Sequence, residues 1–274
     1  MKSIIVVPAR YASTRFPGKP LEAIIAGKKM IDRVYEIAVK AGESTGSEVV
    51  IATEDQRIVD YCKENNMKCV LTSDNCKTGT DRVCETVQNL DYKPDYILNL
   101  QGDAPLTPPW VLQSLLEEFA RAEKDGDKVD MVTPGIEMTW EQLDTLREQK
   151  KTTPFSGTSI ILDRKTNNAV WFSKNIIPAV RKEEKHRESM EKSPVIRHVG
   201  LYGYSYDLLM ELGKLPEDYY EKFEGLEQLR ALTNGYKIRV VMADYKGRPS
   251  SSGVDTPEDV KRTEALIQKF GELV

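Results

Sequence analysis

Short apolar runs alternate with amphipathic segments along the N-terminal part of the chain. The run from Ser3 to Pro8 is rich in β-branched side chains and ends at a proline, which predicts a buried strand. Later runs have the same character, and the segments between them repeat apolar residues at helical spacing. Such an alternation is typical of a parallel sheet with both faces covered. The predicted strands are 3–8, 48–53, 68–72 and 95–100, and the predicted helices are about 30–41, 55–65, 80–90 and 109–122.

The pattern changes in the second half of the chain, where predicted strands follow one another without a long helix between them. We therefore expect one α/β domain over residues 1–274, a doubly wound sheet that carries a smaller β-rich lobe at about 150–235. The predicted elements of this half are strands at 131–134, 158–162, 169–172, 198–204 and 237–242, and helices at 226–232 and after Pro257.

Composition narrows the class of protein. Hydrophobic residues make up 40% and charged residues 30% of 274 residues, which is ordinary for a globular protein. The net charge of -4 argues against broad nucleic-acid binding, which usually needs a basic face. The apolar run from Ile4 to Val7 is too short for a membrane span or a signal sequence. We expect a cytoplasmic protein with no nucleic-acid or membrane partner.

A densely charged run, RKEEKHRESMEK, occupies residues 181–192. A solvated loop or surface helix is the simpler interpretation of such a run. A mobile lid over a substrate is the alternative.

The loop that follows the first predicted strand, residues 8–19, carries cations and hydroxyl groups. In a doubly wound sheet, ligands lie at the carboxyl ends of the strands, which is where this loop begins. No acidic residue occurs between Val6 and Leu21. One guanidinium group can donate two parallel hydrogen bonds to the oxygens of a phosphate. The spacing is not that of a P-loop. We predict a triphosphate site, with a merely basic surface loop as the alternative; its polar residues are Arg10, Ser13, Thr14, Arg15 and Lys19.

Two aspartates are candidate magnesium ligands. Asp103 follows the fourth predicted strand, and Asp255 precedes the last predicted helix after another strand. Both therefore lie at the edge of the sheet where the loop begins, and Mg²⁺ favours a few carboxylates together with phosphate oxygens and water. The alternatives are a turn residue for Asp103 and a neighbour of a helix cap for Asp255.

Six stretches resemble the 3-deoxy-manno-octulosonate (KDO) cytidylyltransferase family, in that family's order and from end to end of the chain. They are PARYASTRFPGKPL at 8–21, TGTDRV at 78–83, LQGDAPL at 100–106, RHVGLYGY at 197–204, EGLEQLRAL at 224–232 and GVDTPEDV at 253–260. The resemblance implies a Rossmann-like fold, a homodimer, CTP as donor, an acidic keto-sugar as acceptor and Mg²⁺ as cofactor. It also implies a CMP-sugar product of the kind used in lipopolysaccharide biosynthesis, and a role of the smaller lobe in substrate binding and dimerisation.

The resemblance also assigns roles to matching positions. Catalytic roles fall on Arg10, Arg15, Lys19 and Asp103, and metal binding on Asp103 and Asp255. Nucleotide binding falls on Pro8, Ala9, Arg10, Ser13, Lys19, Gly79, Thr80, Asp81 and Arg82. Sugar binding falls on Gln101, His198, Tyr202, Glu227 and Gln228. A histidine that opens a strand is more often structural, but the match favours a contact between His198 and the substrate carboxylate.

The sugar-facing part departs from the family pattern. Ala104 replaces the usual acidic residue after Gly-Asp, and Lys174 replaces the usual arginine. The CTP part agrees better, so the acceptor stays open among KDO, a related ulosonic acid and an amino-substituted one. Another sugar or nucleotide, or a non-catalytic nucleotide-binding paralogue, are the remaining alternatives.

Overall fold

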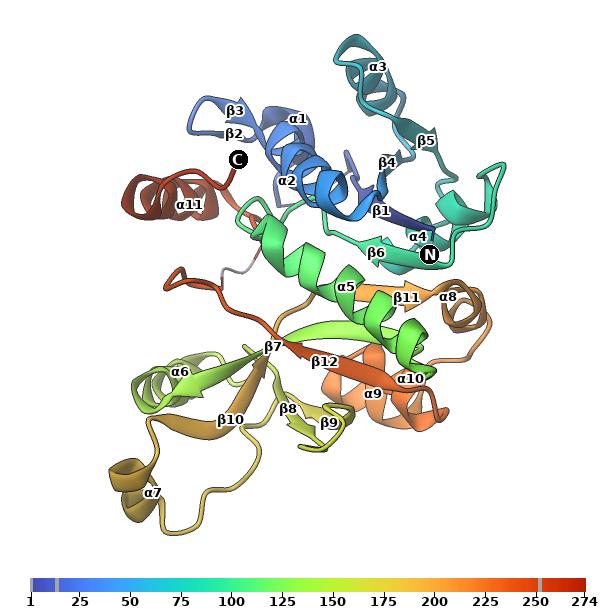
Figure 1. Ribbon diagram of the computed structural model, residues 1–274. Coiled ribbons are helices and arrows are strands. Elements are labelled where there is room, and N and C mark those ends of the chain that lie inside the picture. The colour runs from blue at the N-terminus through green and yellow to red at the C-terminus, as the bar shows by residue number, and fades with distance from the viewer. Residues whose placement is uncertain (1, 13–14, 251–252) are drawn as a thin grey trace.

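The computed structural model describes residues 2–12, 15–250 and 253–274. One large mixed sheet runs through the molecule in the order β5-β4-β1-β6-β11-β7-β10-β8-β9, with β12 paired to β7 (Figure 1). The strands are β1 (Ser3–Pro8), β4 (Glu48–Thr53), β5 (Cys69–Leu71), β6 (Tyr96–Asn99), β7 (Met131–Thr139), β8 (Ser159–Leu162), β9 (Ala169–Ser173), β10 (Lys192–His198), β11 (Tyr202–Ser205) and β12 (Ile238–Met242). The short strands β2 (Ile24–Ile25) and β3 (Lys28–Lys29) form a separate hairpin.

Helices cover both faces of this sheet, as an α/β fold requires. They are α1 (Lys19–Glu22), α2 (Met30–Thr45), α3 (Gln56–Glu64), α4 (Gly79–Gln88), α5 (Pro109–Asp125), α6 (Trp140–Thr152), α7 (Glu183–Ser189), α8 (Tyr206–Leu212), α9 (Tyr219–Glu224), α10 (Gln228–Thr233) and α11 (Pro257–Phe270). None of the helices in the described ranges combines the length and the apolar surface that a membrane crossing needs.

The N-terminal half forms the parallel part of the sheet. Strands β5, β4, β1 and β6 are all parallel, as the continuous apolar runs predict. Successive residues of a strand face opposite sides, so Ile5 and Val7 pack on the core cluster of α2 and α5. Ile4 and Val6 pack on the opposite cluster, which includes residues of α4 and α8. The predicted α/β fold is confirmed, and all four parallel strands end at one edge.

The second half adds antiparallel strands to the same sheet, since β11 pairs with β6 and β7, and β10 with β7 and β8. The predicted single strand over 198–204 is wrong, because residues 199–201 interrupt it. His198 lies opposite Gly135 and Gly203 opposite Val132, so the register against β7 shifts across the interruption. The hydroxyl of Thr133 fills this gap by donating to the carbonyl of Leu201 at 2.9 Å.

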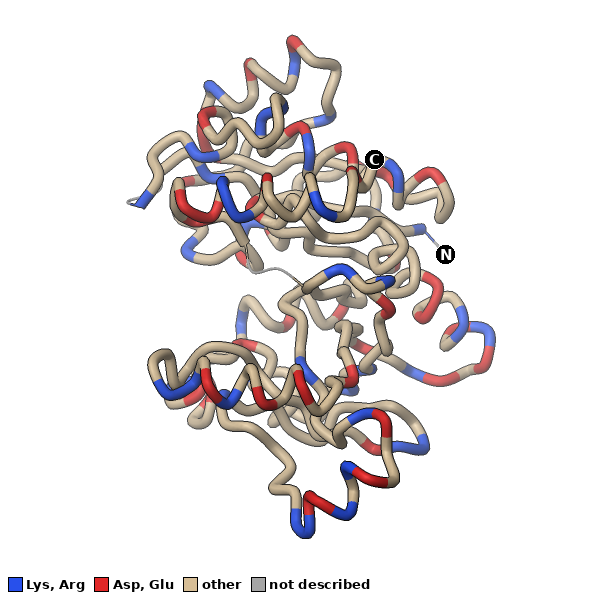
Figure 2. Tube along the Cα trace, turned by 90° about the vertical axis from the view of Figure 1, so that its left-hand side faces the viewer, with Lys and Arg blue, Asp and Glu red and all other residues tan. Residues whose placement is uncertain are grey.

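The charged run forms a short helix that ion pairs hold against α6. Glu183 of α7 accepts from Arg147 at 2.7 Å, and Arg187 donates to Asp144 at 2.6 Å. The bonds from Arg147 and then Arg187 lower the pKa of Glu183 to about 2. Blue and red positions alternate along this projecting segment in Figure 2. These contacts support the surface helix over the mobile lid.

Candidate active site

A close backbone contact places Asp103 beside the N-terminal loop. The carbonyl of Pro8, the last residue of β1, accepts from the amide of Gly102 at 3.2 Å. A Cβ at Gly102 would lie 2.5 Å from that carbonyl oxygen, so a side chain does not fit there. Ala9 is tied in turn to β4, because its amide donates to the carbonyl of Ala52 at 2.8 Å. The backbone at the end of β1 therefore holds the start of the N-terminal loop next to the loop that carries Asp103.

Lys19 joins the two predicted metal ligands. Its Nζ lies 3.1 Å from Oδ2 of Asp103, 3.1 Å from Oδ1 of Asp255 and 2.7 Å from the carbonyl oxygen of Val254. Lys19 begins α1 directly after Gly18, whose φ of 69° suits glycine. The structure thus brings together one residue of the loop and two aspartates from distant parts of the sequence.

The two loop arginines keep their guanidinium groups exposed. Arg15 pairs with Oδ2 of Asp255 at 3.1 Å, and its side chain is 66% exposed. Arg10 donates to the carbonyl of Lys77 at 3.4 Å. Both side chains reach solvent at this edge of the sheet, where an anionic ligand can meet them. Ser13, and Thr14 beside it, lie outside the described residues.

The start of α4 lies next to this loop and reaches toward the predicted sugar residues. A Cβ at Gly79 would lie 3.0 Å from the side-chain oxygen of Gln101, which places these two residues in contact. The hydroxyl of Thr80 donates to Glu227 at 2.7 Å. Asp81 uses its carboxylate as part of the helix cap, where it accepts from the amide of Thr78 at 2.9 Å. The residues predicted to bind the nucleotide therefore contact those predicted to bind the sugar.

Arg82 lies inside the protein and exposes no part of its side chain to a ligand. Its side chain is fully buried, pairs with Glu54 at 2.8 Å and donates to the hydroxyl of Thr72. Glu54 also lies 4.0 Å from Arg10. Glu54 thus connects Arg82 to the loop arginine Arg10. Sequence reasoning missed Glu54, although its position directly after β4 marks the same carboxyl edge.

An aromatic row forms the other end of the site. Tyr202 donates to the side chain of Gln228 at 3.1 Å, and its ring centroid is 5.4 Å from that of His198. The ring of His198 in turn meets the edge of Phe172 at 5.3 Å between centroids. Burial raises the pKa of the nearby Glu227 carboxyl. These side chains offer hydrogen-bonding groups on an aromatic wall, which suits a hydroxylated ligand.

His198 is neutral. Burial, and next the charge of Lys174, lower its pKa to about 3. Its Nε2 is 2.9 Å from the hydroxyl of Thr133, which donates its own proton to Leu201, so Nε2 carries the hydrogen and Nδ1 stays an acceptor. A neutral ring contributes no charge to a substrate carboxylate. Lys174, noted in the sequence only as a departure from the family, is a cation whose charge acts on His198.

The two aspartates fit the coordination habits of Mg²⁺. Within the described ranges, no group of three His, Cys, Asp or Glu side chains could hold a metal by itself. Mg²⁺ is usually bound by one or two carboxylates with substrate phosphates and water. Asp103 and Asp255 already share one cationic group, which shows that a positive charge is accommodated between them.

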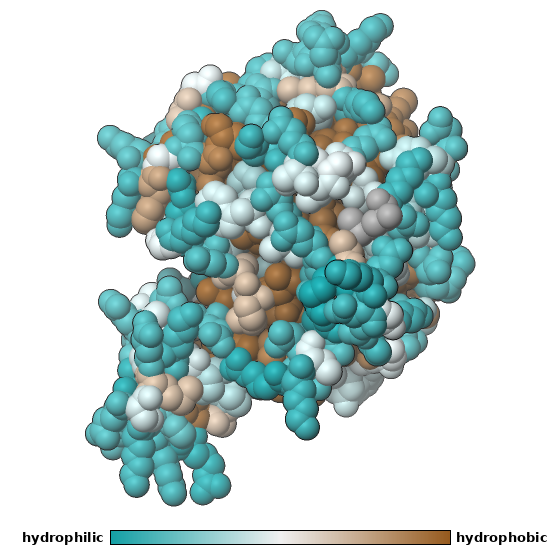
Figure 3. All heavy atoms as spheres, in the orientation of Figure 1, coloured by the Kyte–Doolittle hydropathy of each residue, from teal (hydrophilic) through white to brown (hydrophobic). Residues whose placement is uncertain are grey.

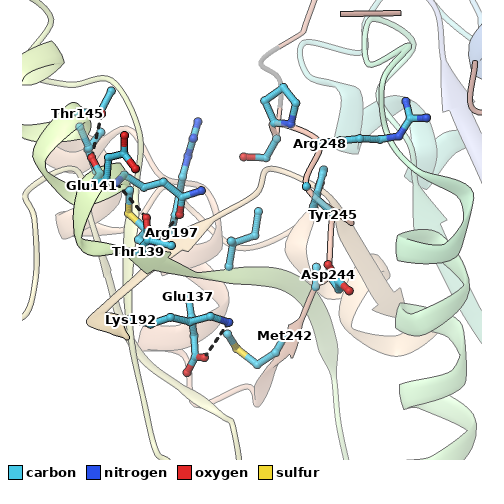
Figure 4. Close-up of a pocket in the computed structure, with 18 of the residues that line it drawn as sticks. Glu137, Thr139, Glu141, Thr145, Lys192, Arg197, Met242, Asp244, Tyr245 and Arg248 are labelled. Atoms are coloured by element: carbon cyan, nitrogen blue, oxygen red, sulfur yellow. Dashed lines mark hydrogen bonds and ion pairs between the residues drawn. The ribbon is translucent and has the colours of Figure 1, made fainter. Parts of the chain in front are cut away.

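A cavity of about 760 Å³ lies beside the second half of the sheet, on the face opposite to the one that His198 occupies. Arg197, next to His198 on β10, lines it together with Tyr245 and Met242 (Figure 4). In Figure 3, a hollow at the left separates the part of the molecule that holds α6 and α7 from the rest, and the cavity opens toward this hollow. Of the predicted site residues that the structure describes, none lines this cavity, so the candidate site is the open edge of the sheet around Lys19 and Gln101.

Comparison with known proteins gives this site a family. A family model described as Cytidylyltransferase matches residues 4–238. The chain is 44% identical over 274 residues to a 3-deoxy-manno-octulosonate cytidylyltransferase of Maricaulis maris, with 100% of both chains covered. It is 36% identical to an 8-amino-3,8-dideoxy-manno-octulosonate cytidylyltransferase of Shewanella pealeana, with 97% of this chain and 99% of that one covered.

A solved structure, that of a CMP:2-keto-3-deoxy-manno-octonic acid synthetase complexed with CTP, has the same fold. It superposes with a TM-score of 0.81 at 31% identity and covers 98% of this chain and 99% of its own. These similarities cover at least 97% of this chain. The chain belongs to the cytidylyltransferase family.

Proposed function

We propose that this chain couples CTP to KDO, or to a close relative of that sugar acid, to give a CMP-sugar and pyrophosphate. The observation that carries this proposal is the end-to-end similarity to a KDO cytidylyltransferase. The contacts among Lys19, Asp103 and Asp255 beside the loop support it, because they gather a cation and two carboxylates at the carboxyl edge of the sheet, where ligands of such folds lie. Mg²⁺ as cofactor is part of the proposal.

The reaction needs charge neutralisation more than covalent chemistry from the protein. The anomeric hydroxyl oxygen of the sugar forms a bond to the α-phosphorus of CTP, the bond from that phosphorus to the bridging oxygen breaks, and the hydroxyl proton passes to solvent. Arg10 and Arg15 have exposed guanidinium groups that would neutralise the departing pyrophosphate. Asp103 and Asp255 would hold Mg²⁺, which when bound neutralises phosphate charge and makes a nearby hydroxyl more acidic.

The acceptor would lie against the aromatic row and the amide groups beside it. Gln101 and Tyr202 carry polar ends that can bond sugar hydroxyls. His198 would accept a hydrogen bond from a sugar hydroxyl at Nδ1, because its Nε2 is already bonded to Thr133. The carboxylate of the sugar would meet Lys174, whose charge already acts on His198.

An acceptor panel tests the proposal. CTP, UTP, ATP and GTP would each be offered with KDO, 8-amino-3,8-dideoxy-KDO or N-acetylneuraminate, and the products identified by mass. We expect a CMP-sugar with CTP and an eight-carbon acid only. Absence of any product with CTP contradicts the proposal, and a product from only the amino sugar would move it to the activity named for the Shewanella relative.

Asp103→Asn isolates the contribution of the metal-binding pair. We expect this variant to lose nearly all turnover while its urea unfolding curve stays close to that of the wild type. Asp207→Asn is the matched control, because that carboxylate has an 88% exposed side chain. Retained turnover of Asp103→Asn at saturating Mg²⁺ would contradict the metal assignment. The homodimer implied by the resemblance also stays a proposal, which sedimentation equilibrium would test.

A further inference from the structure

All three donors of the Lys19 ammonium group have partners at the candidate metal site. They point to Asp103 at 3.1 Å, Asp255 at 3.1 Å and the carbonyl of Val254 at 2.7 Å. The lysine side chain is only 11% exposed, whereas those of the two aspartates are 35% and 38% exposed. The ammonium group therefore lies beneath the carboxylates, held from below by the backbone.

The remaining oxygen of Asp255 also meets a cation. Arg15 reaches it at 3.1 Å from the solvent side. Asp255 is therefore contacted on both carboxylate oxygens by positive groups of the chain itself. In this state the pair of carboxylates has internal counter-ions and does not need an external one.

A divalent cation cannot join this arrangement without moving Lys19. Mg²⁺ holds its oxygen ligands at about 2.0–2.1 Å, so an ion shared by Asp103 and Asp255 would come next to Nζ. Two positive charges in contact, on a side chain that is mostly shielded from water, repel strongly. Lys19 must therefore find another anionic partner before the carboxylates are open to the ion.

We propose that Lys19 is a positioning residue that closes the Asp103–Asp255 pair to free divalent cations, and that a bound triphosphate opens it. The triphosphate offers oxygens to both Lys19 and Arg15, which draws the two cations away from Asp255. The exclusion of free cations depends on this chain alone, and only the opening by a triphosphate rests on the proposed function. The nucleotide then enters before the metal ion or together with it.

Binding of Mn²⁺ without nucleotide tests the closed state. Mn²⁺ is a spectroscopic substitute for Mg²⁺, and electron paramagnetic resonance counts the free ion during a titration. We expect the wild type to bind Mn²⁺ alone no more tightly than about 1 mM, and Lys19→Met to bind it about tenfold more tightly or better. The gain should vanish in Lys19→Met/Asp103→Asn, which lacks one of the two carboxylates. Lys28→Met, at a lysine paired with Glu36 on the surface, is the control that should change nothing.

Micromolar binding of Mn²⁺ by the wild type without nucleotide would overturn the proposal, and so would a Lys19→Met variant that gains no affinity. If Lys19→Met does not fold, Lys19→Gln takes its place, and the wild-type titration still decides the matter. The opening step is read from the melting temperature, which we expect to rise more with CTP and Mn²⁺ together than with the two separate shifts combined. Exclusion of Mn²⁺ without any effect of CTP would refute the proposed function while leaving the closed state intact.

Discussion

Lowering the pH from about 7.5 to about 5 should destabilise this protein through His198. The folded pKa of this histidine is about 3, whereas an unfolded histidine titrates near its ordinary value of 6.5. The unfolded chain therefore binds a proton between these two pH values and the folded chain does not. Stability from this group is complete above about pH 6.5 and falls as the pH decreases toward about 3. About pH 5 is about 1.5 units below the unfolded pKa, and each unit costs about 1.4 kcal/mol, so the free energy of unfolding falls by about 2 kcal/mol.

Urea unfolding followed by circular dichroism at several pH values measures this loss. His198→Gln is the informative variant, because an amide nitrogen can still donate to Thr133 but does not titrate. We expect the free energy of unfolding of this variant to change by about 2 kcal/mol less than that of the wild type over the same interval. The chain has two histidines, and His186→Gln on the exposed face of α7 is the control that keeps the wild-type dependence. Parallel pH profiles for the wild type and His198→Gln would refute the neutral buried state.

Two further substitutions test how the site is supported. Arg82→Met should lower the free energy of unfolding by about 3 kcal/mol or more, because it removes the close ion-pair partner of the nearly buried Glu54 and leaves only Arg10 at 4.0 Å. A loss below about 1 kcal/mol would contradict this structural role of Arg82. Gly102→Ala should cost about 1–3 kcal/mol in urea unfolding, because its Cβ would lie 2.5 Å from the carbonyl of Pro8. Gly200→Ala, with nothing within 4 Å of its Cβ, is the matched control, and equal stabilities of the two variants would contradict the steric argument.

The pattern of apolar residues was sufficient for the parallel half of the fold. The predicted strand over 3–8 has the same bounds as β1, and the run over 48–53 has the same bounds as β4. Apart from Glu48 at the start of β4, every residue of these two strands is buried, so the apolar residues form continuous runs that are visible in the sequence. The capping residue Thr256 and the proline after it likewise mark the start of α11 from local chemistry alone.

The second half shows where local pattern is insufficient. Helix α6 was not predicted, because its apolar side chains Trp140, Leu143 and Leu146 stand among many charged residues. The interruption at 199–201 was not predicted either, since its residues read as a continuation of the strand. Within it, the carbonyl of Leu201 accepts from the hydroxyl of Thr133, which comes from β7 and is distant in sequence. The register of a strand depends on its partner strand, and the periodicity within the segment does not show such a contact.

By itself the sequence determined the α/β class, the loop at the end of the first strand and, through the resemblance, the family. Those features depend on neighbours along the chain or on motifs that keep their order. The tertiary structure decided the state of each polar group: Lys19 is a shared counter-ion of Asp103 and Asp255, Arg82 is a buried partner of Glu54, and His198 is neutral. The physical reason is that charge, burial and hydrogen bonding are set by atoms within a few ångströms in space, and at this site those atoms come from distant parts of the chain.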